Sequence, residues 1–389
     1  MARATPRLLK DLNERTVLET IRDGSPISRA EISRRVGISK PTVSLALQSL
    51  VDAGLVREAK EEPGGPSYGA VFFEPVAEAA LVLGLDLGGR FLRGAICDLR
   101  GQIRARQDVE IHVADTEGAV EEILSLRSSL VEAAGLEARL LDGAVVGVPG
   151  VVEAPEGRIS LATNVAGLEG REFRPKLERR LGLSVTLEND INLAALGEQR
   201  LGVAQGVENF VFISVGTGLG AGLVLHGELH RGQHGAAGEL DNALPTLVPD
   251  ADPSAGAVAA LAARLAGEPG AETSLAPPYD PRAIFDAARR DDAVARAVVA
   301  ELARRIALHV APIGAVADVE LVVLGGGLGR NGDLLLEPIR GLLSEWLPYP
   351  PRVEVSTVGE AAVLAGALSV GLRSALDNVF VALRSGLPR

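Results

Sequence analysis

"ISVGTGLGAGLVLHGELHRGQHGAAGELDN", residues 213–242, gathers glycines, histidines and acids directly after an apolar run. The run predicts a strand, and a loop at Gly216, Thr217 and Gly218 separates it from a return strand. Bare backbone N–H groups in such a loop suit phosphate binding, although a tight hairpin explains the same pattern. The loop alone therefore does not decide between a working phosphate site and one that has lost its chemistry.

A similar unit opens the earlier half of the body. "ALVLGLDLGGRFLRGAICDL", residues 80–99, predicts a strand ending near Asp86, a turn at Gly88 and Gly89, and a second strand. Two strand–glycine–strand units, one in each half, predict a duplicated, two-lobed α/β fold that closes over a nucleotide. A third strand runs into consecutive glycines within residues 319–329, where bare backbone lets a base or ribose approach closely.

The segment "LSVTLENDINLAALGEQRLG", residues 183–202, brings polar groups to a strand end. An apolar strand delivers Glu188, Asn189 and Asp190 at the point where a helix begins. Such groups suit a polyol ligand, because an amide both donates and accepts hydrogen bonds and a carboxylate takes a hydroxyl proton. The alternative is that Asn189 and Asp190 only cap the helix.

Charge is unevenly distributed along the 389 residues. The net charge of −12 argues against nucleic acid, yet residues 1–50 hold nine basic and five acidic side chains, a balance of +4 that leaves −16 for the remainder. This asymmetry predicts a basic module joined to an acidic body.

The basic module reads as a helix-turn-helix over residues 13–53. Glycine stops and serine caps divide it into three helices, and Val43, Leu47, Leu50 and Val51 are predicted to form the buried stripe of the third. The second helix of the paired motif enters the major groove. The candidate DNA contacts are the polar residues off that stripe, namely Ser39, Lys40, Thr42, Ser44 and Gln48.

Residues 55–75 predict two strands joined by a Gly/Pro-rich tip, as in a winged helix. The tip is acidic, with only Arg57 and Lys60 nearby, so little DNA affinity is expected from it. A three-helix bundle used for dimerisation or docking is the alternative interpretation of residues 1–76.

Composition narrows the class of protein. No apolar run reaches the roughly 20 residues that a membrane span needs, and residues 1–16 lack the apolar core of a signal peptide, so we expect a cytoplasmic protein that does not enter a membrane. The single cysteine, Cys97, excludes an internal disulfide and a multi-cysteine metal site.

Taken in order, these motifs resemble the ROK family (repressors, open reading frames and sugar kinases) of the actin-like ATPase superfamily, and in particular its regulators with an N-terminal winged helix. The resemblance covers nearly the whole chain, through "GLDLGG", "GVPG", "LENDINLAALGE", "VGTGLGAGL", "RGQHGAAGEL" and "VLGGGLG". It implies a winged helix at residues 1–76, a first α/β lobe at 77–195 completed by a C-terminal helix at about 357–389, and a second lobe at 196–356.

The resemblance also implies roles for individual residues. Asp190 corresponds to the general base of the family's kinases. The nucleotide-phosphate loops correspond to Asp86, Gly88 and Arg90 in the first lobe and to Gly216, Thr217 and Gly218 in the second. Sugar contacts map to Asn164 (with Thr163 as its alternative), Asn189, Asp190, Glu239 and Asn242, while His234 either faces the pocket or lies in solvent.

Two departures from the family's kinases concern phosphate and metal. In "DLGGR", Arg90 stands where the kinases carry a small hydroxyl residue, and phosphoryl transfer depends on such positioning. Asn242 replaces a histidine, and the zinc-binding cysteines that follow it in the family are missing, whereas a structural zinc site needs four ligands. We therefore expect no metal and no resident cofactor, and leave ATP binding open because Asp86 and the second loop remain.

We interpret the chain as a transcriptional regulator, a repressor, that binds double-stranded operator DNA as a homodimer or higher homo-oligomer. A sugar or sugar derivative in the cleft acts as effector, and Asp190 is a vestigial base without efficient phosphoryl transfer. One alternative is a cytoplasmic ATP-dependent sugar kinase with an N-terminal extension, for which Asp190 argues. Another is a DNA-binding protein whose vestigial pocket responds to a partner protein.

Overall fold

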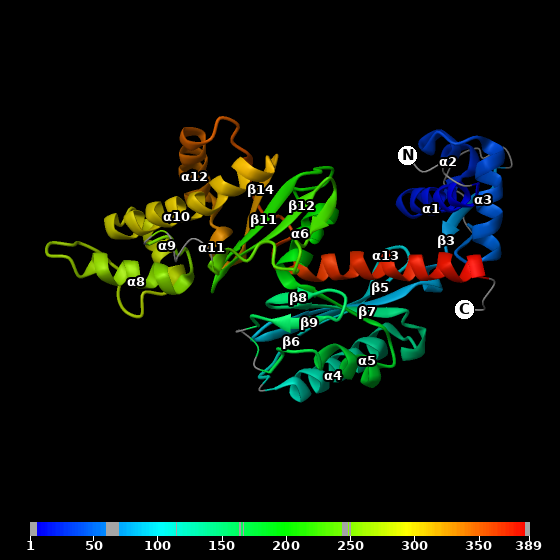
Figure 1. The fold of residues 1–389 in the computed structure, drawn as a ribbon, viewed down its shortest axis with the longest axis horizontal. Coiled ribbons are helices and arrows are strands. Elements are labelled where there is room, and N and C mark those ends of the chain that lie inside the picture. Colours follow the sequence, from blue (N-terminus) through cyan, green and yellow to red (C-terminus); the bar gives the residue numbers. More distant parts are fainter. Residues whose placement is uncertain are drawn as a thin grey trace.

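The computed structural model describes residues 6–59, 70–113, 115–162, 165, 167–242, 248 and 250–385. It consists of a small helical head and two larger lobes, each built on a five-stranded sheet (Figure 1). The long C-terminal helix, red in Figure 1, runs along the first lobe and reaches the head.

Serine caps and a glycine stop divide the head into its helices. Its elements are α1 (Pro6–Gly24), β1 (Ile27–Ser28), α2 (Arg29–Val36), α3 (Lys40–Asp52), β2 (Val56–Glu58) and β3 (Phe72–Pro75). The Oγ of Ser28 accepts a hydrogen bond from the amide of Glu31 at 3.3 Å, and the Oγ of Ser39 accepts one from the amide of Thr42 at 3.4 Å. Gly37 ends α2 in the left-handed conformation, at φ 67°.

The head matches the predicted order of helices and strands, with two differences in detail. The first helix begins at Pro6, ahead of the apolar residues that suggested it. Val51, predicted to be buried, is 38% exposed, because it lies about 100° around the helix from Leu50, while Ala46 takes its place in the buried stripe. The wing strands are β2 and β3, and the predicted wing tip at 60–69 lies outside the described residues.

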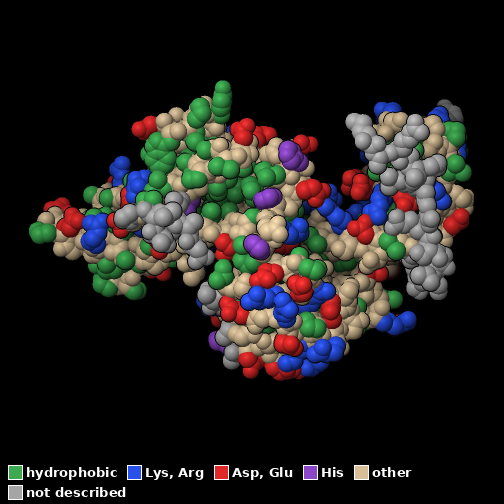
Figure 2. All heavy atoms as spheres, in the orientation of Figure 1, with side chains coloured by type: hydrophobic (Ala, Val, Ile, Leu, Met, Phe, Trp, Pro, Cys, Tyr) green, Lys and Arg blue, Asp and Glu red, His purple; other side chains and the backbone are tan. Residues whose placement is uncertain are grey.

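The first lobe is a mixed sheet with helices on both faces. Its elements are β4 (Leu81–Leu87), β5 (Phe91–Asp98), β6 (Ile103–Glu110), α4 (Thr116–Ala134), β7 (Gly143–Val148), β8 (Val151–Glu153), β9 (Arg158–Ser160), α5 (Phe173–Leu181), β10 (Val185–Asn189) and α13 (Ala362–Ser385). The strand order is β10-β7-β4-β5-β6, with α4 and α5 below and α13 above in Figure 1. Figure 2 shows charges of both signs over this lobe, where Arg180 pairs with Glu117 and Glu121.

The second lobe repeats this plan. Its elements are β11 (Phe210–Val215), β12 (Leu219–Leu225), β13 (Glu228–His230), η3 (Leu240–Asn242), α8 (Ala255–Ala266), α9 (Pro281–Arg289), α10 (Ala293–Ala317), β14 (Leu321–Gly325), α11 (Gly326–Gly329), α12 (Gly332–Trp346) and β15 (Arg352–Val355). The strand order is β13-β12-β11-β14-β15. Alternate residues of β11 serve two cores, since Val211 and Ile213 pack with the helices α8 to α12 while Phe210 and Phe212 face the other side.

Two helices connect the lobes. α6 (Asp190–Leu201) begins where β10 ends and packs against both α13 and the strands β11 and β12. Among the described residues, the stretch Gly359–Val381 is the one helix long and apolar enough to cross a membrane by length and composition, and 56% of it is buried inside the protein. Its packing on the first sheet accounts for that apolar character.

The head is packed directly onto the body. Val17, Leu18 and Ile21 of α1 belong to one buried cluster together with Leu372 and Leu376 of α13. A shared core of this kind fixes the head against the body, because separating them exposes apolar surface to water.

Candidate functional site

The junction of β10 and α6 holds the predicted sugar-contacting residues. The Oδ1 of Asn189 accepts the amide of Asn192 at 2.9 Å, and its Nδ2 donates to the carbonyl of Gly150 at 2.9 Å. Asn189 is therefore the N-cap of α6 and ties it to the loop after β7. The capping interpretation holds for this residue, which still has one amide hydrogen and one lone pair for a ligand.

Asp190 has a strongly perturbed carboxyl group. Its Oδ1 accepts the amide of Ile191 at 2.9 Å, and its Oδ2 has no hydrogen-bond partner among the described residues. The pKa of Asp190 is raised to about 7, mainly by burial and in part by the negative charges of Asp86 and Glu239. The structure therefore places three acids, one from each of three separate segments, within electrostatic reach of one another.

Asp86, on β4, has its own arginine. Arg93 lies directly opposite it on β5, with Nη1 and Oδ2 separated by 3.1 Å. Burial raises the pKa of Asp86 to about 6, and the positive charge of Arg93 opposes that rise. Arg93 was missed in the sequence, yet counting back from the turn at Gly88 and Gly89 pairs it with Asp86.

Arg90 points along the sheet edge. It is exposed, its Nε lies 2.8 Å from the Oε1 of Glu110 on β6, and its guanidinium lies 5.3 Å from the ring centre of Phe91. Gly88 holds the turn closed, because its amide donates to the carbonyl of Phe91 at 2.9 Å. Arg90 thus turns away from Asp86, while Arg93 supplies the cation.

The second predicted phosphate loop is held by hydrogen bonds from within the protein. Gly216 donates its amide to the carbonyl of Gly218 at 2.9 Å, and Thr217 is exposed. The Oδ1 of Asp241 accepts the amide of Leu219 at 2.8 Å, and a Cβ on Gly218 would lie 2.6 Å from the Oδ2 of Asp241. A carboxylate therefore lies against the loop that would bind a phosphate.

The third glycine segment joins β14 to α11. Gly326 has φ 77°, and a Cβ there would lie 2.4 Å from the carbonyl oxygen of Val215. Only glycine fits such a close approach of two strand ends in the left-handed region. The packing of the fold is enough to explain this glycine.

Of the remaining predicted sugar contacts, the structure describes the side chains of Glu239 and His234. Glu239 is partly buried, and its pKa is raised by burial and by the charge of Asp241. His234 is exposed in the loop between β13 and η3. Asn242 is the last residue of η3, but its side chain lies outside the described part, as do Thr163 and Asn164.

An ion pair that sequence reasoning missed lies beside this junction. The Nε of Arg231, in the loop after β13, lies 2.7 Å from the Oε2 of buried Glu188. The Oε1 of Glu188 also accepts the Nδ2 of Asn192 at 3.0 Å. The pair connects the two lobes beside Asp190. It could not be predicted from the sequence because its two residues lie far apart in the chain.

No group of three or more His, Cys, Asp and Glu in the described part of the chain could hold a metal ion. The residues at the family's zinc position do not suit that metal, because Asn242 stands in place of a histidine ligand and the chain has a single cysteine. The site also suits a nucleotide phosphate poorly. Asp241 accepts the amide hydrogen of Leu219 beside the second loop, and Arg93 forms an ion pair with Asp86.

The predicted DNA contacts lie on or beside α3. Ser39, Lys40 and Gln48 are exposed, and Lys40 forms no ion pair with any residue that the structure describes. Ser44 accepts a hydrogen bond from the Nη1 of Arg29 at 3.1 Å, and Arg29 is an exposed cation on α2 that sequence reasoning left out. Exposed cations beside exposed polar groups at a helix start are typical of a recognition helix.

The geometry defines a class: a winged-helix head joined to a two-lobed body with the fold of a sugar kinase. The model of the ROK family matches residues 82–373, and a winged helix-turn-helix DNA-binding model matches residues 10–57. The chain belongs to the ROK family.

Similar proteins include both repressors and kinases. The xylose repressor of Caldicellulosiruptor bescii is 26% identical, with 95% of this chain and 98% of that protein covered. The glucokinase of Halalkalibacterium halodurans is 31% identical, with 73% of this chain and 93% of the kinase covered. A solved ROK family transcriptional regulator, a homolog of the E. coli MLC protein, shares the fold with a TM-score of 0.79 at 24% identity, covering 96% and 98% of the two chains.

The kinase match covers 73% of the chain, whereas the repressor match covers 95% and therefore extends into the head. With the head, the family match and the full-length likeness to repressors, the chain is a DNA-binding, sugar-responsive transcriptional repressor.

Proposed function

We propose that the interlobe cleft binds a sugar without phosphorylating it, and that sugar binding changes the affinity of the head for operator DNA. One observation carries this proposal: Asp241 lies against the second phosphate loop, on the amide of Leu219, while the Oδ2 of Asp190 has no protein partner in the described part. In this proposal, Asp190 offers an oxygen to accept a hydrogen bond from a sugar hydroxyl, and the carboxylate of Asp241 occupies the place of a phosphate.

The loss of transfer follows from electrostatics. A phosphoryl group brings negative charge to the loop and needs cations and amide donors there. Here Asp241 adds a like charge at the loop, and Arg93 neutralises the acid that would face a metal ion. Both changes act against nucleotide phosphate. We propose that the protein works without zinc and without ATP.

The effector is an aldose, and xylose is the first candidate to test, because relatives that match 93% and 95% of the chain are named as xylose repressors. A ligand alters operator affinity only if it binds two arrangements of the protein with different affinity. The lobes supply such a difference, since Asp190 and Glu239 come from different lobes and a sugar between them favours a closed cleft.

We further propose a homodimer in the cytoplasm on a palindromic operator, since paired helix-turn-helix heads read half-sites related by two-fold symmetry. Sugar kinase activity is the second candidate, favoured by one observation: Asp190, at the position of the kinases' base, has its pKa raised to about 7, which suits proton abstraction at neutral pH.

Footprinting of the purified full chain on genomic DNA, followed by addition of xylose, glucose and other aldoses, tests the main proposal. We expect a protected palindrome at low salt that is released, or strengthened, by one sugar and not by its epimers. A complete lack of protection at low salt contradicts DNA recognition, and protection that no sugar alters contradicts the effector role.

A further inference from the structure

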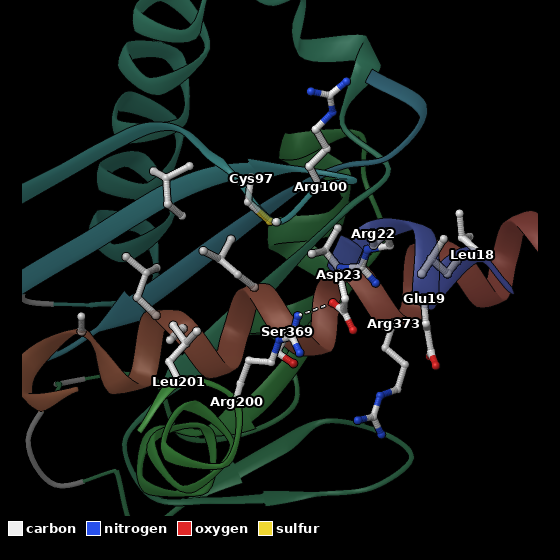
Figure 3. Close-up of a pocket in the computed structure, with 18 of the residues that line it drawn as sticks. Leu18, Glu19, Arg22, Asp23, Cys97, Arg100, Arg200, Leu201, Ser369 and Arg373 are labelled. Carbon is white, nitrogen blue, oxygen red and sulfur yellow. Dashed lines mark ion pairs between the residues drawn. The ribbon is translucent and has the colours of Figure 1, made fainter. Parts of the chain in front are cut away.

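A cavity of about 620 Å³ lies between the head and the body, away from the interlobe cleft (Figure 3). It is enclosed by α1 of the head, the turn between β5 and β6, the end of α6 and one face of α13. This volume falls in the range of small-molecule sites, which run from about 300 to 1,000 Å³. Both parts of the protein contribute to it, so an occupant would contact the head and the body together.

The lining is strongly basic on its polar side. Two acids, Glu19 and Asp23, face the cavity against six arginines. Four of these arginines pair with acids outside the lining, namely Asp377, Glu74, Asp108 and Glu228, which leaves Arg22 and Arg200 to the cavity. Figure 2 shows Lys and Arg side chains together with Asp and Glu side chains in the recess between head and body. The six arginines are Arg15, Arg22, Arg100, Arg106, Arg200 and Arg373.

Arg22 is the least satisfied of these cations. It is half-buried on α1, and its Nε donates to the carbonyl of Leu99 at 2.7 Å. Its two terminal nitrogens have no hydrogen-bond partner among the described residues. Burial lowers the pKa of Arg22, and the positive charge of Arg200 lowers it further. Arg22 of the head and Arg200 of the body thus both line the cavity.

Arg200 approaches from the body. In Figure 3 it lies beside Ser369 and faces Asp23, while Arg100 and Arg373 point away from this centre. Its Nη2 is 3.7 Å from the Oδ1 of Asp23, an ion pair without a hydrogen bond, and its side chain is 55% exposed. Asp23 therefore compensates the pair of arginines only in part, and their remaining donors face the cavity.

The rest of the lining is apolar. One face of α13 contributes Leu368, Leu372 and Leu376, and Leu18 of α1 faces them. An inorganic anion leaves the exposed side chains of Ile103 and Leu201 uncovered, and a neutral apolar molecule leaves the terminal nitrogens of Arg22 without a partner. The lining is complementary to a molecule that has both an oxyanion and an apolar part.

We propose that this cavity is a second ligand site, in which Arg22 of the head and Arg200 of the body together bind the oxyanion of a small organic carboxylate or phosphate monoester whose apolar part lies on α13. Because the two cations belong to different parts, the ligand adds a polar contact to the apolar core that joins the head to the body. The lining contains neither Asp190 nor Glu239, so the site is separate from the proposed sugar site.

Calorimetric titration of the full chain with hexyl phosphate tests the site, with hexanol and inorganic phosphate as the probes that each lack one feature. We expect hexyl phosphate to bind at least tenfold more tightly than either. Arg22→Gln and Arg200→Gln should each weaken its binding at least fivefold. Arg352→Gln, which removes an exposed arginine of β15 paired with Glu320, should change nothing. Since Arg200 is exposed, its variant remains informative if Arg22→Gln fails to fold.

Three outcomes overturn the proposal. Equal binding of hexyl phosphate and hexanol rejects the oxyanion contact. Undiminished binding in Arg200→Gln rejects the location. Loss of hexyl phosphate binding in Asp190→Asn, or competition by the effector sugar, moves the ligand into the cleft. Retained binding in Asp190→Asn supports a separate site whether or not the sugar proposal holds.

Discussion

The residues proposed to bind a sugar and those predicted to bind a phosphate differ in what their polar groups are bound to. On the sugar side, Asp190 keeps an oxygen without a protein partner, and burial raises its pKa to about 7. On the phosphate side, Asp241 bonds the amide of Leu219, and Arg93 pairs with Asp86. The two sides therefore have separate hydrogen-bond and ion-pair partners, although the charge of Asp86 still raises the pKa of Asp190.

The largest expected effect is on the sugar side. Asp190→Asn should weaken effector binding by about tenfold or more, since a hydrogen bond to a charged group contributes about 1.5 to 3 kcal/mol. Asp86→Asn, the matched change on the phosphate side, should alter effector affinity by less than about threefold, being tied to Arg93. Calorimetric titration with the effector measures both. An equal loss in the two variants would show that the sides are not separable.

The second prediction concerns pH. The raised pKa of Asp190 leaves its carboxyl mostly protonated at pH 6 and mostly ionised at pH 8. A sugar hydroxyl donates to the ionised form, so effector affinity should rise by about tenfold over this interval, and Asp190→Asn should flatten the profile. The stability of the ligand-free protein should change in the opposite direction. The native state binds the proton of Asp190 more tightly than the unfolded chain does, so the free energy of unfolding falls as pH rises from about 4 to about 7. A falling affinity with rising pH contradicts the assigned hydrogen bond.

A third change tests the phosphate side directly. Asp241→Ala removes a negative charge from the loop and frees the amide of Leu219, so affinity for a non-hydrolysable ATP analogue should rise several-fold, by about 1 kcal/mol. Asp252→Ala, a nearby acid that bonds the amide of Ser254, is the control. Fluorescence titration with a labelled nucleotide compares them. Unchanged nucleotide binding in Asp241→Ala would mean that Asp241 is not what closes the loop.

The smallest expected effect belongs to Thr217. It is exposed at the tip of the second loop, so Thr217→Ala should leave both effector affinity and the free energy of unfolding within about 0.5 kcal/mol of the original. Denaturant unfolding and sugar titration give the two values, and a large loss in the sugar titration places Thr217 in the effector's network.

Much of the fold follows from local pattern. Serine caps, glycine stops and alternating apolar strands place the helices of the head and the strand–glycine–strand units, because these signals depend on neighbours in the chain. Val51 was misplaced because helical spacing alone left two residues competing for one buried position.

The site was predictable in its members and not in their partners. Asp190, Glu239 and the loops stand out as motifs, whereas Asp241 on Leu219 and Arg231 on Glu188 join residues 22 and 43 positions apart in the chain. Such pairs depend on how the two lobes meet, which no local pattern contains. Arg93 is the exception, since hairpin register alone brings it opposite Asp86.

The most direct test of the account follows both activities in one sample. Full-length protein bound to labelled operator DNA is mixed with ATP, Mg²⁺ and the effector sugar, and operator occupancy and sugar phosphate are measured together. The account predicts that the sugar changes operator occupancy to the same extent with and without ATP while no sugar phosphate accumulates. Turnover of ATP into sugar phosphate that disappears in Asp190→Asn would contradict it.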